Sequence, residues 1–390
     1  MDVRALIRAL ACASLMAHLL ACGSRTGLEA VLLDADVPFD ASADAFGDRV
    51  AVDRLLVRPD IVLRSCDGGA LPIPGPVSSE RTTGRWGVTA VFDPATRRIL
   101  SLGGSPSGGT RAAPPFVLDV DTGRVTVFRL TGVSMLPIGA AAVWDERRSR
   151  ALLVGGRYPD GGFFSPGRAV LDVRVQGDAA VVTPLADHPV GAVSGAAIAI
   201  DPERDVLVVT GGGNESAPPT TAYRATWSLP LGAASPRWDR RTPEQDSPPA
   251  GIGRQMGWDP EIRRLVLAGG WVGPMRDRRA WVLEGGRWRN VPGVLDAVPA
   301  NVTGLLWDGR ACGFVMTSGR CSAEVWLLRV RELPAMALLG RLTRASGFPG
   351  SDGSALFLDG ARDRLLLLGG EDCQNSGGTY TAFEHVPLRR

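Results

Sequence analysis

The sequence contains no lysine, and it has few cysteine, histidine or tyrosine residues. All 43 basic residues among the 390 are arginine, against 41 acidic residues, 6 Cys, 3 His and 3 Tyr. The net charge of +2 gives no electrostatic reason to expect nucleic-acid binding. Six cysteines in a chain of this length are too sparse for a small disulfide scaffold. The composition is that of a globular chain, not of a disordered or fibrous one.

Signatures of catalysis and of cofactor binding are also absent. The sequence has no Gly-x-Ser-x-Gly, no P-loop and no coenzyme fingerprint. Beyond an N-terminal leader, only His188 and His385 remain as histidines, and they do not have the spacing of metal ligands. We therefore expect neither a cofactor nor a metal, and no residue is predicted to be catalytic.

The first segment with a clear signal is the N-terminus. Arg4 and Arg8 precede an apolar run over residues 9–21, which ends in Leu19-Leu20-Ala21-Cys22-Gly23. The run suits a signal core and is shorter than the roughly 20 residues of a membrane span. It resembles the lipobox of bacterial lipoproteins, which implies loss of residues 1–21 and lipid attachment to Cys22. Gly23, in place of Asp, implies an outer-membrane lipoprotein, either periplasmic or surface-exposed, that meets the membrane through its lipid only.

An acidic stretch follows this leader. Residues 22–53 contain seven acidic residues and two arginines, and Ala, Ser and Asp dominate residues 34–48. Such a composition is typical of a solvated tether. Residues 54–83 then contain a short apolar segment and a proline-rich linker before the main domain.

A repeated unit fills the rest of the chain. Each copy has an apolar strand ending in Asp and, ten residues after that Asp, a pair of small residues that is usually Gly-Gly. The Asp residues and the first residues of the pairs are Asp93 and Gly103, Asp145 and Gly155, Asp201 and Gly211, Asp259 and Gly269, Asp308 and Ser318, and Asp359 and Gly369. A spacing that is constant in six copies is the signature of a repeat architecture.

The chemistry of the unit predicts a β-hairpin. Asp starts a turn because its carboxylate accepts nearby backbone N–H groups. The second strand is almost wholly apolar, as in Leu365-Leu366-Leu367-Leu368, which indicates burial on both faces. The glycine pair ends this strand where a side chain would clash or where a positive φ is needed. Two weaker strands complete each unit, as at residues 116–119 and 125–128 of the first copy.

Six units of four strands predict an all-β fold, a six-bladed β-propeller with four-stranded antiparallel blades. The repeat resembles the kelch family, which includes the central domain of galactose oxidase. The features that carry this resemblance are the Asp-terminated strand, the Gly-Gly pair and an aromatic residue on the outer strand, at Trp238 and Trp288. The expected blades are residues 84–134, 135–190, 191–249, 250–299, 300–347 and 348–390.

The sixth unit is short of an outer strand, so we expect an N-terminal strand to complete the last blade. The candidate is the apolar segment Ile61-Val62-Leu63-Arg64 within residues 60–66. In an exported chain this places Cys66 near Cys373, and a disulfide between them would clasp the ring. A Cys312–Cys321 pair needs a bulge or short strands and stays open.

The loops after Gly-Gly are long and differ among the copies, and the links between blades open on the same side. Variable loops on a regular scaffold are the usual place for binding. The candidate residues on this face are Arg85, Arg157, Tyr158, Asp160, Arg254, Trp271, Arg276, Glu371 and Asp372. Of these, Arg85 and Arg254 precede inner strands and are expected at the mouth of the channel. Arginine with aromatic residues can hold a carboxylate or a sugar.

Three functions remain open at this point, the last of them a purely structural surface protein. The first is a monomeric, non-enzymatic binding module that is anchored in the cell envelope and presents this face to a protein or a glycan. The alternative is a carbohydrate-active enzyme, such as an acidic-sugar mutarotase or an oxidase, using Arg and carboxylates at the channel mouth. A mutarotase needs only a general acid and a general base, which leave no motif. Convergence of Arg85, Arg254 and Glu371 in one pocket would favour the enzyme.

Overall fold

The chain divides into two units, Met1–Asp53 and Arg54–Arg390, and a computed structural model describes residues of the second. The described ranges are 73–74, 78–81, 87–106, 112–160, 163–213, 222–292, 294, 298–299, 302–318, 324–331, 335–342, 351–352, 354–369, 371–372, 378–379 and 382–389. Within them, no helix has the length and apolar character to cross a membrane.

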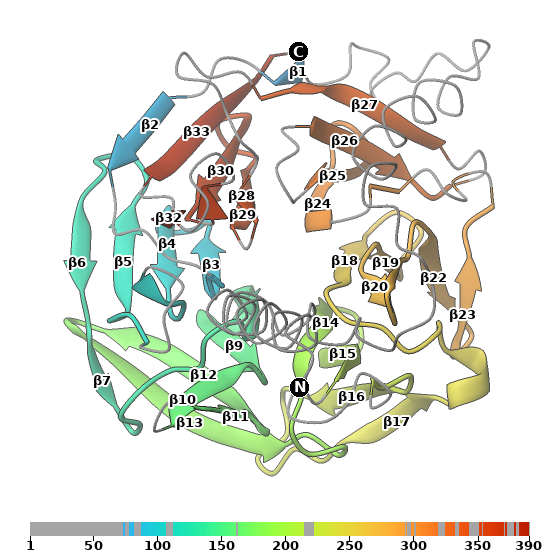
Figure 1. Cartoon of the computed structure of the whole chain (residues 1–390), viewed down its shortest axis with the longest axis horizontal. Helices are drawn as coiled ribbons and strands as arrows, with labels where there is room; N and C mark the ends of the chain where they lie inside the picture. Colours follow the sequence, from blue (N-terminus) through green and yellow to red (C-terminus); the bar gives the residue numbers. More distant parts are fainter. Residues whose placement is uncertain are drawn as a thin grey trace, which may run out of the picture. The chain divides into compact units, whose positions relative to one another are not determined.

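Six antiparallel sheets stand around a central axis and form the blades of a β-propeller (Figure 1). From the inner strand outwards, blade 1 consists of β3 (Ala90–Asp93), β4 (Arg98–Ser101), β5 (Phe116–Asp119) and β6 (Val125–Val127). Blade 2 contains β8 (Ala141–Asp145), β9 (Arg150–Val154), β12 (Ala169–Gln176) and β13 (Ala179–Asp187). Blade 3 contains β14 (Ser194–Asp201), β15 (Val206–Gly213), β16 (Thr226–Pro230) and β17 (Asp239–Thr242).

The other three blades repeat this order. Blade 4 consists of β18 (Gln255–Asp259), β19 (Arg264–Ala268), β22 (Ala280–Glu284) and β23 (Arg287–Asn290). Blade 5 consists of β24 (Val302–Asp308), β25 (Gly313–Ser318), β26 (Glu324–Arg329) and β27 (Ala335–Arg341). Blade 6 contains β29 (Ala355–Asp359), β30 (Arg364–Leu368) and β33 (Ala382–Arg389). The helices among the described residues are two 3-10 turns, η3 (Glu146–Arg148) and η5 (Glu244–Asp246).

The register of the inner hairpins confirms the predicted repeat. In every blade the Asp ends the inner strand and pairs with the residue five positions later, from Asp93 with Arg98 to Asp359 with Arg364. All six Asp residues are buried. The second strands are buried as predicted, and all five residues of β9 lie inside. The core therefore lies in layers between neighbouring blades, as where Ile99 and Phe116 of blade 1 pack with Phe357 and Leu366 of blade 6.

An N-terminal segment completes blade 6, as predicted, but it is not the predicted one. β1 (Ile73–Pro74) and β2 (Ser78–Arg81) both pair antiparallel with β33. The outer position assigned to residues 61–64 is thus held by the proline-rich stretch and the polar residues after it. Only the outermost strand of a sheet tolerates a proline easily, because one of its edges needs no hydrogen-bond partner. Residues 60–66 lie outside the described ranges.

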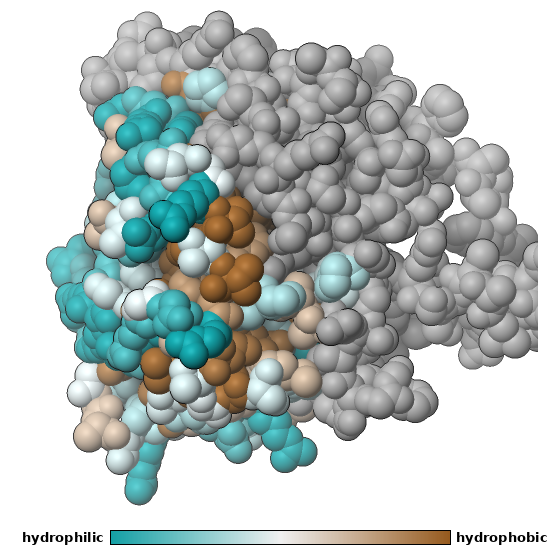
Figure 2. Space-filling view, turned by 90° about the vertical axis from the view of Figure 1, so that its left-hand side faces the viewer, coloured by the Kyte–Doolittle hydropathy of each residue, from teal (hydrophilic) through white to brown (hydrophobic). Residues whose placement is uncertain are grey.

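Blade 2 has a fifth strand that the repeat did not predict. The chain leaves β6 at the edge of blade 1 and enters β7 (Arg129–Thr131), which pairs in parallel with β13. A single stretch of backbone therefore spans blades 1 and 2 (Figure 1). On this side of the molecule hydrophobic side chains lie between hydrophilic ones (Figure 2), and Val127 of β6 is 60% exposed.

Candidate functional site

The face that carries the glycine pairs is built on one repeated backbone contact. In blade 2, Ile138 and Arg157 exchange both backbone hydrogen bonds, at 2.8 and 2.9 Å, and in blade 4 Ile252 and Trp271 do the same at 3.0 and 2.9 Å. Each pair joins the residue seven before the repeat Asp to the residue two after the first glycine. Blade 3 pairs Ser194 with Gly213 at the same two positions, and blade 6 pairs Asp352 with Glu371. In these four blades the backbone pairing is therefore the same where the side chains differ.

The glycine pairs are needed for both of the reasons that the sequence suggested. Gly155 and Gly156 have φ of 68° and 81°, a region that favours glycine. A Cβ on Gly155 would also lie 2.0 Å from the carbonyl oxygen of Val193, in the link that enters blade 3. A Cβ on Gly211 would lie 2.7 Å from the carbonyl of Gly251, in the link to blade 4. Each pair thus lets the link to the next blade approach closely.

Among the described residues, three blades extend this face with a small hairpin after the glycine pair (Figure 1). Blade 2 carries β10 (Arg157–Asp160) and β11 (Phe163–Pro166), and blade 4 carries β20 (Trp271–Val272) and β21 (Met275–Arg276). In blade 6, β31 (Glu371–Asp372) pairs with β28 (Ser351–Asp352) and β32 (Gly378–Thr379). Seven of the nine candidate residues lie on these hairpins. We call the surface formed by the three hairpins and the links between blades the mouth face.

The side chains on the mouth face are of several chemical kinds. Arg157 and Tyr158 of blade 2 are half-buried, and burial raises the pKa of the Tyr158 hydroxyl. On blade 4, the Arg276 guanidinium lies over the Trp271 ring, 5.3 Å from its centroid. Met275, at the turn of the same hairpin, is 69% exposed. Arginine, aromatic and thioether groups all contribute contacts in binding sites, so this composition suits a binding surface.

Arg254 is not at the channel mouth, which corrects the prediction. Its side chain is 3% exposed and forms an ion pair of 2.7 Å with Asp277, whose side chain is fully buried. It also donates to the carbonyl of Pro249 at 2.8 Å, and Asp277 accepts a second bond from Arg279 at 2.6 Å. Burial lowers the pKa of Arg254 while Asp277 opposes this effect. Arg254 therefore holds the base of the blade 4 hairpin and does not face a ligand.

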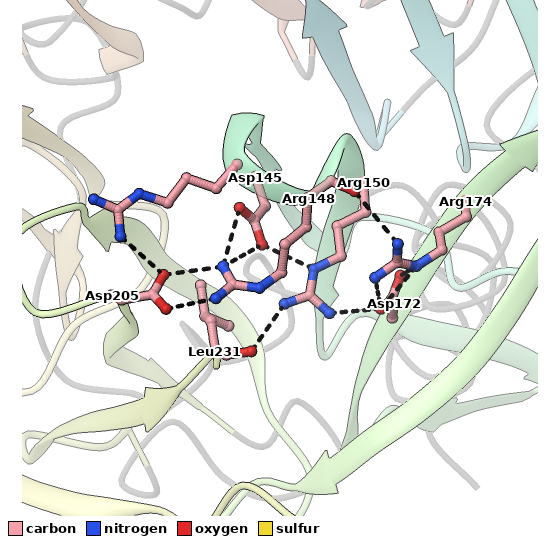
Figure 3. Close-up of polar contacts among 8 residues, drawn as sticks. Asp145, Arg148, Arg150, Asp172, Arg174, Asp205 and Leu231 are labelled. Carbon is pink, nitrogen blue, oxygen red and sulfur yellow. Dashed lines mark hydrogen bonds and ion pairs between the residues drawn. The ribbon is translucent and has the colours of Figure 1, made fainter. Parts of the chain in front are cut away.

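The opposite face, at the Asp turns, is occupied by ion pairs between blades. Arg148 of blade 2 binds both carboxylate oxygens of Asp205 in blade 3, at 2.9 and 2.5 Å, and also reaches Asp145 (Figure 3). The neighbouring Arg150 bridges Asp145 and Asp172 at 2.8 and 2.6 Å. The hydrogen bonds from Arg148 hold the pKa of Asp205 below its usual range, against a smaller opposing effect of burial.

A repeated backbone conformation places these partners. The non-glycine residues with positive φ in the described ranges number six, and each lies four positions after a repeat Asp: Arg97, Ser149, Asp205, Arg263, Cys312 and Asp363, with φ between 47° and 56°. This left-handed conformation costs a non-glycine residue about 1 kcal/mol. Four of the six side chains form an ion pair with the preceding blade: Arg97 with Asp359, Asp205 with Arg148, Arg263 with Glu203 and Asp363 with Arg310. A fifth, Cys312, has its Sγ 3.2 Å from a carboxylate oxygen of Glu261 in blade 4.

Of these four ion pairs between blades, the one that joins blade 1 to blade 6 is the most buried. Arg97 donates two hydrogen bonds of 2.8 Å to Asp359, whose side chain is 2% exposed, and two more to Asp121 at 2.8 and 2.9 Å. Burial alone would raise the pKa of Asp359, but hydrogen bonds from Arg97 and Arg364 outweigh it and keep the pKa below its usual value. The hydrogen bond from Arg97 also contributes most to lowering the pKa of Asp121, to about 2. We call the face that carries the Asp turns the turn face. On this face, the ion pair between Arg97 and Asp359 joins the first blade to the last.

The structure places most of the predicted site residues, and what they bind stays a prediction. It brings Arg157, Tyr158, Trp271 and Arg276 to the mouth face, and it removes Arg254 from the channel mouth. Asp160, Glu371 and Asp372 lie on hairpin strands of this face, and Arg85 lies outside the described residues. Met275 was not predicted, and the hairpin turn signal Gly273-Pro274 just before it could have drawn attention to it.

Two further predictions concern metals and cysteines. Among the described residues, no group of three or more His, Cys, Asp or Glu side chains could hold a metal ion. Cys312 is disulfide-bonded. Cys22, Cys66 and Cys373 lie outside the described ranges, so the predicted lipidation and the predicted disulfide stay predictions.

Comparisons with known proteins give little beyond this geometry. No protein-family model and no curated protein matches the sequence. The solved structures that are similar include one described as "Structure of YjhT", with 14% sequence identity and a TM-score of 0.49. That alignment covers 65% of this chain and 84% of the other. The blade count rests on the strand pairing of this chain alone.

Proposed function

We propose that this chain is a binding module of the bacterial cell envelope, a kelch-type propeller anchored through a lipid on Cys22. The mouth face would meet a protein or a glycan, and the propeller would act as a monomer. No step in this function requires a cofactor or a bond to be made or broken.

The observation that carries this proposal is the contrast between the two faces. On the mouth face the same backbone pairing supports different side chains, Arg157 in blade 2 and Trp271 in blade 4. A rigid scaffold with exchangeable side chains is the arrangement that binding surfaces use. On the turn face, by contrast, arginines and carboxylates are engaged with each other across blades, as in the pair Arg97–Asp359.

The carbohydrate-active enzyme is less well supported. This alternative required Arg85, Arg254 and Glu371 to converge at the channel mouth. The side chain of Arg254 is instead buried, where it binds Asp277 and the carbonyl of Pro249. A buried arginine in an ion pair is costly to withdraw from its partner, since this leaves a buried charge unpaired.

Photo-crosslinking from the two faces tests the proposal. A photoreactive residue replaces Tyr158 on the mouth face or Arg310 on the turn face, and each chain of residues 23–390 is illuminated in cell-envelope extract. We expect a discrete adduct from position 158 and none from position 310. Adducts from position 310 alone would contradict the proposal.

A thermal-shift screen tests the enzyme. The chain is titrated with neutral, uronic and sialic sugars and with copper, because a ligand at 100 times its dissociation constant adds about 2.7 kcal/mol to stability. Binding of one small sugar or of copper, with turnover of that sugar, would replace the binding module by the enzyme. We expect no shift.

A further inference from the structure

We propose that Cys312 forms its disulfide with Cys66, and that this bond fastens the chain before β1 across the turn of blade 5. The inference goes beyond the proposed function and does not depend on what the mouth face binds. It is carried by the burial of the blade 5 turn, by the distance between the two faces, and by the direction in which the chain enters β1.

The turn of blade 5 is covered, unlike the turns of the other blades. Ala311 and Cys312, three and four positions after the repeat Asp, are 0% and 4% exposed. In the other five blades both of these positions are partly or fully exposed: Thr96 and Arg97, Arg148 and Ser149, Arg204 and Asp205, Ile262 and Arg263, and Arg362 and Asp363. Blade 5 therefore has a cover over its turn that the other blades lack.

The neighbours of this turn lie where the N-terminal strands attach. Ala311 packs in a hydrophobic cluster that contains Leu342, directly after β27, and Leu388 of β33. Leu388 pairs with Pro74 of β1, and β1 also contacts β27 of blade 5 (Figure 1). Strand β1 therefore lies beside the hydrophobic layer that receives Ala311.

The chain enters β1 from the turn face. Strand β33 is antiparallel to β30, and Arg364, which follows the blade 6 turn, pairs with Pro387 near the end of β33. Ile73 of β1 pairs with Arg389, two residues further on. The residues before Ile73 therefore start on the face that carries the turn of blade 5.

The segment before β1 is long enough to reach Cys312. Cys66 is seven residues before Ile73, and seven residues span at most about 25 Å. A four-stranded blade is about 15 Å wide from its inner to its outer strand. The sulfur of Cys312 lies on the turn face, 3.2 Å from a carboxylate oxygen of Glu261, which also pairs with Arg331. A chain that crosses this end of blade 5 therefore passes the sulfur.

Cys321 is too far from Cys312 to be its partner. Strand β25 begins directly after Cys312 and ends at Ser318, which puts Ser318 about 20 Å from Cys312. Cys321 is three residues beyond Ser318, and three residues return at most about 11 Å. The remaining separation of about 9 Å exceeds the roughly 7 Å that a disulfide spans between Cα atoms.

Cys373 is on the wrong face. It directly follows Asp372 of β31, which belongs to the mouth face. The length of β30, about 13 Å, separates that face from the turn. The sequence favoured Cys66–Cys373 because it assigned the closing strand to residues 61–64, which placed Cys66 at the mouth end. With the closing strands at β1 and β2, Cys66 precedes their turn-face end instead.

Formation of the bond is a two-electron oxidation. The two thiols lose two protons and two electrons to the disulfide of a protein thiol oxidase, which leaves as a dithiol. The bond encloses blades 1 to 4 and the closing strands in one covalent loop. It also attaches blade 5 to the chain before β1, so that a pull from the predicted lipid anchor on Cys22 reaches the blade 5 turn before it reaches β1.

Peptide mapping without reduction tests the pairing. The chain of residues 23–390, which lacks Cys12 and Cys22, is exported to an oxidising compartment, its free thiols are blocked, and it is digested with trypsin. Cleavage after arginine places the four cysteines on separate peptides, residues 65–81, 311–320, 321–329 and 365–389. We expect 65–81 linked to 311–320. A link from 311–320 to either of the other peptides, or a free thiol at position 312, would overturn the proposal.

Thermal unfolding of variants is the second measurement. Cys66→Ser and Cys312→Ser remove the same bond, so each should lower the Tm by about 5 °C or more, and the double variant should lower it no further. Cys321→Ser is the matched control, and its effect should add to that of Cys66→Ser. Losses that add between positions 66 and 312 would show that the two cysteines are not bonded to each other.

Discussion

The buried histidine His188 offers a prediction whose size follows from the structure. It lies in the link between blades 2 and 3, is 4% exposed, and packs edge-on against Trp238 with ring centroids 5.0 Å apart. Neither ring nitrogen has a hydrogen-bond partner among the described residues. Burial therefore lowers the pKa of His188 to about 4, from an ordinary value of 6.5. The perturbation that we consider is His188→Phe, which keeps an aromatic ring at this position.

The sign and the magnitude follow from proton binding. Below pH 6.5 the unfolded chain takes up a proton at this histidine, while the folded chain stays neutral until about pH 4. Stability from this group is therefore intact above pH 6.5 and is lost as the pH falls toward 4. The difference between an ordinary pKa of 6.5 and a pKa of about 4 corresponds to roughly 3 kcal/mol in total, of which about 2 kcal/mol is lost by pH 5.

Urea unfolding at pH 7.5 and at pH 5.0 measures this effect. The difference in unfolding free energy between His188→Phe and the parent chain should move by about 2 kcal/mol in favour of the variant on going to pH 5. Comparing the variant with the parent cancels the carboxylates and His385. NMR titration of the parent chain should show one imidazole with a midpoint near 4, absent in the variant. Equal pH dependence of the two chains would refute the buried neutral histidine.

Two further predictions concern ring closure and blade packing. Arg97→Met removes a partner of buried Asp359 and should lower the unfolding free energy by about 1–3 kcal/mol in urea titrations, whereas Arg129→Met, whose side chain is 79% exposed, should cost less than about 1 kcal/mol. Equal losses would show that burial does not decide the strength of these pairs. Gly155→Ala should cost more than about 2 kcal/mol, against about 1 kcal/mol for the control Gly177→Ala, because both have positive φ but only position 155 is crowded. A thermal-unfolding series with the reverse order would contradict the role given to the pair.

The sequence predicted the inner half of every blade well. The distance from the Asp to the glycine pair is ten residues in every blade, and it spans the turn and the second strand, whose side chains are mostly buried. Apolar periodicity and turn chemistry act on the same residues there, so each supports the other. Pairing of Asp201 with Val206 and burial of Val208 and Val209 are direct outcomes of that agreement.

Prediction was weaker where one of these signals was missing. The segment Ile61–Arg64 was chosen for its apolar character, yet the closing strands include Pro74 and the polar Ser78–Arg81. An outermost strand is held by hydrogen bonds along one edge, so its side chains need not be apolar. Arg254 was misplaced for a different reason. Its position before an inner strand indicates the end of the blade at which it lies. Only the structure shows that its side chain is buried in an ion pair with Asp277.

From the sequence, a candidate face could be named, but its residues could not be ranked. Loop length and composition pointed to the loops that carry Arg157 and Trp271, which the structure shows as short hairpins. The exposure of Met275 depends on how the turn projects, and no residue pattern gives it. The left-handed residues such as Arg97 lie at a fixed position, four after each repeat Asp, but the partners that their side chains reach lie in another blade and are distant in the sequence.

The left-handed residues give the ring a direction. Four of them form ion pairs with the preceding blade, and the glycine pairs lie against the link to the next blade. Each blade therefore presents one kind of surface to its predecessor and a different kind to its successor, like the subunits of a head-to-tail assembly. Such an assembly grows without limit unless its rotation closes. The six blades are in this sense comparable to six unequal subunits of a cyclic assembly that share one chain. Their ring closes where Arg97 of the first blade meets Asp359 of the last.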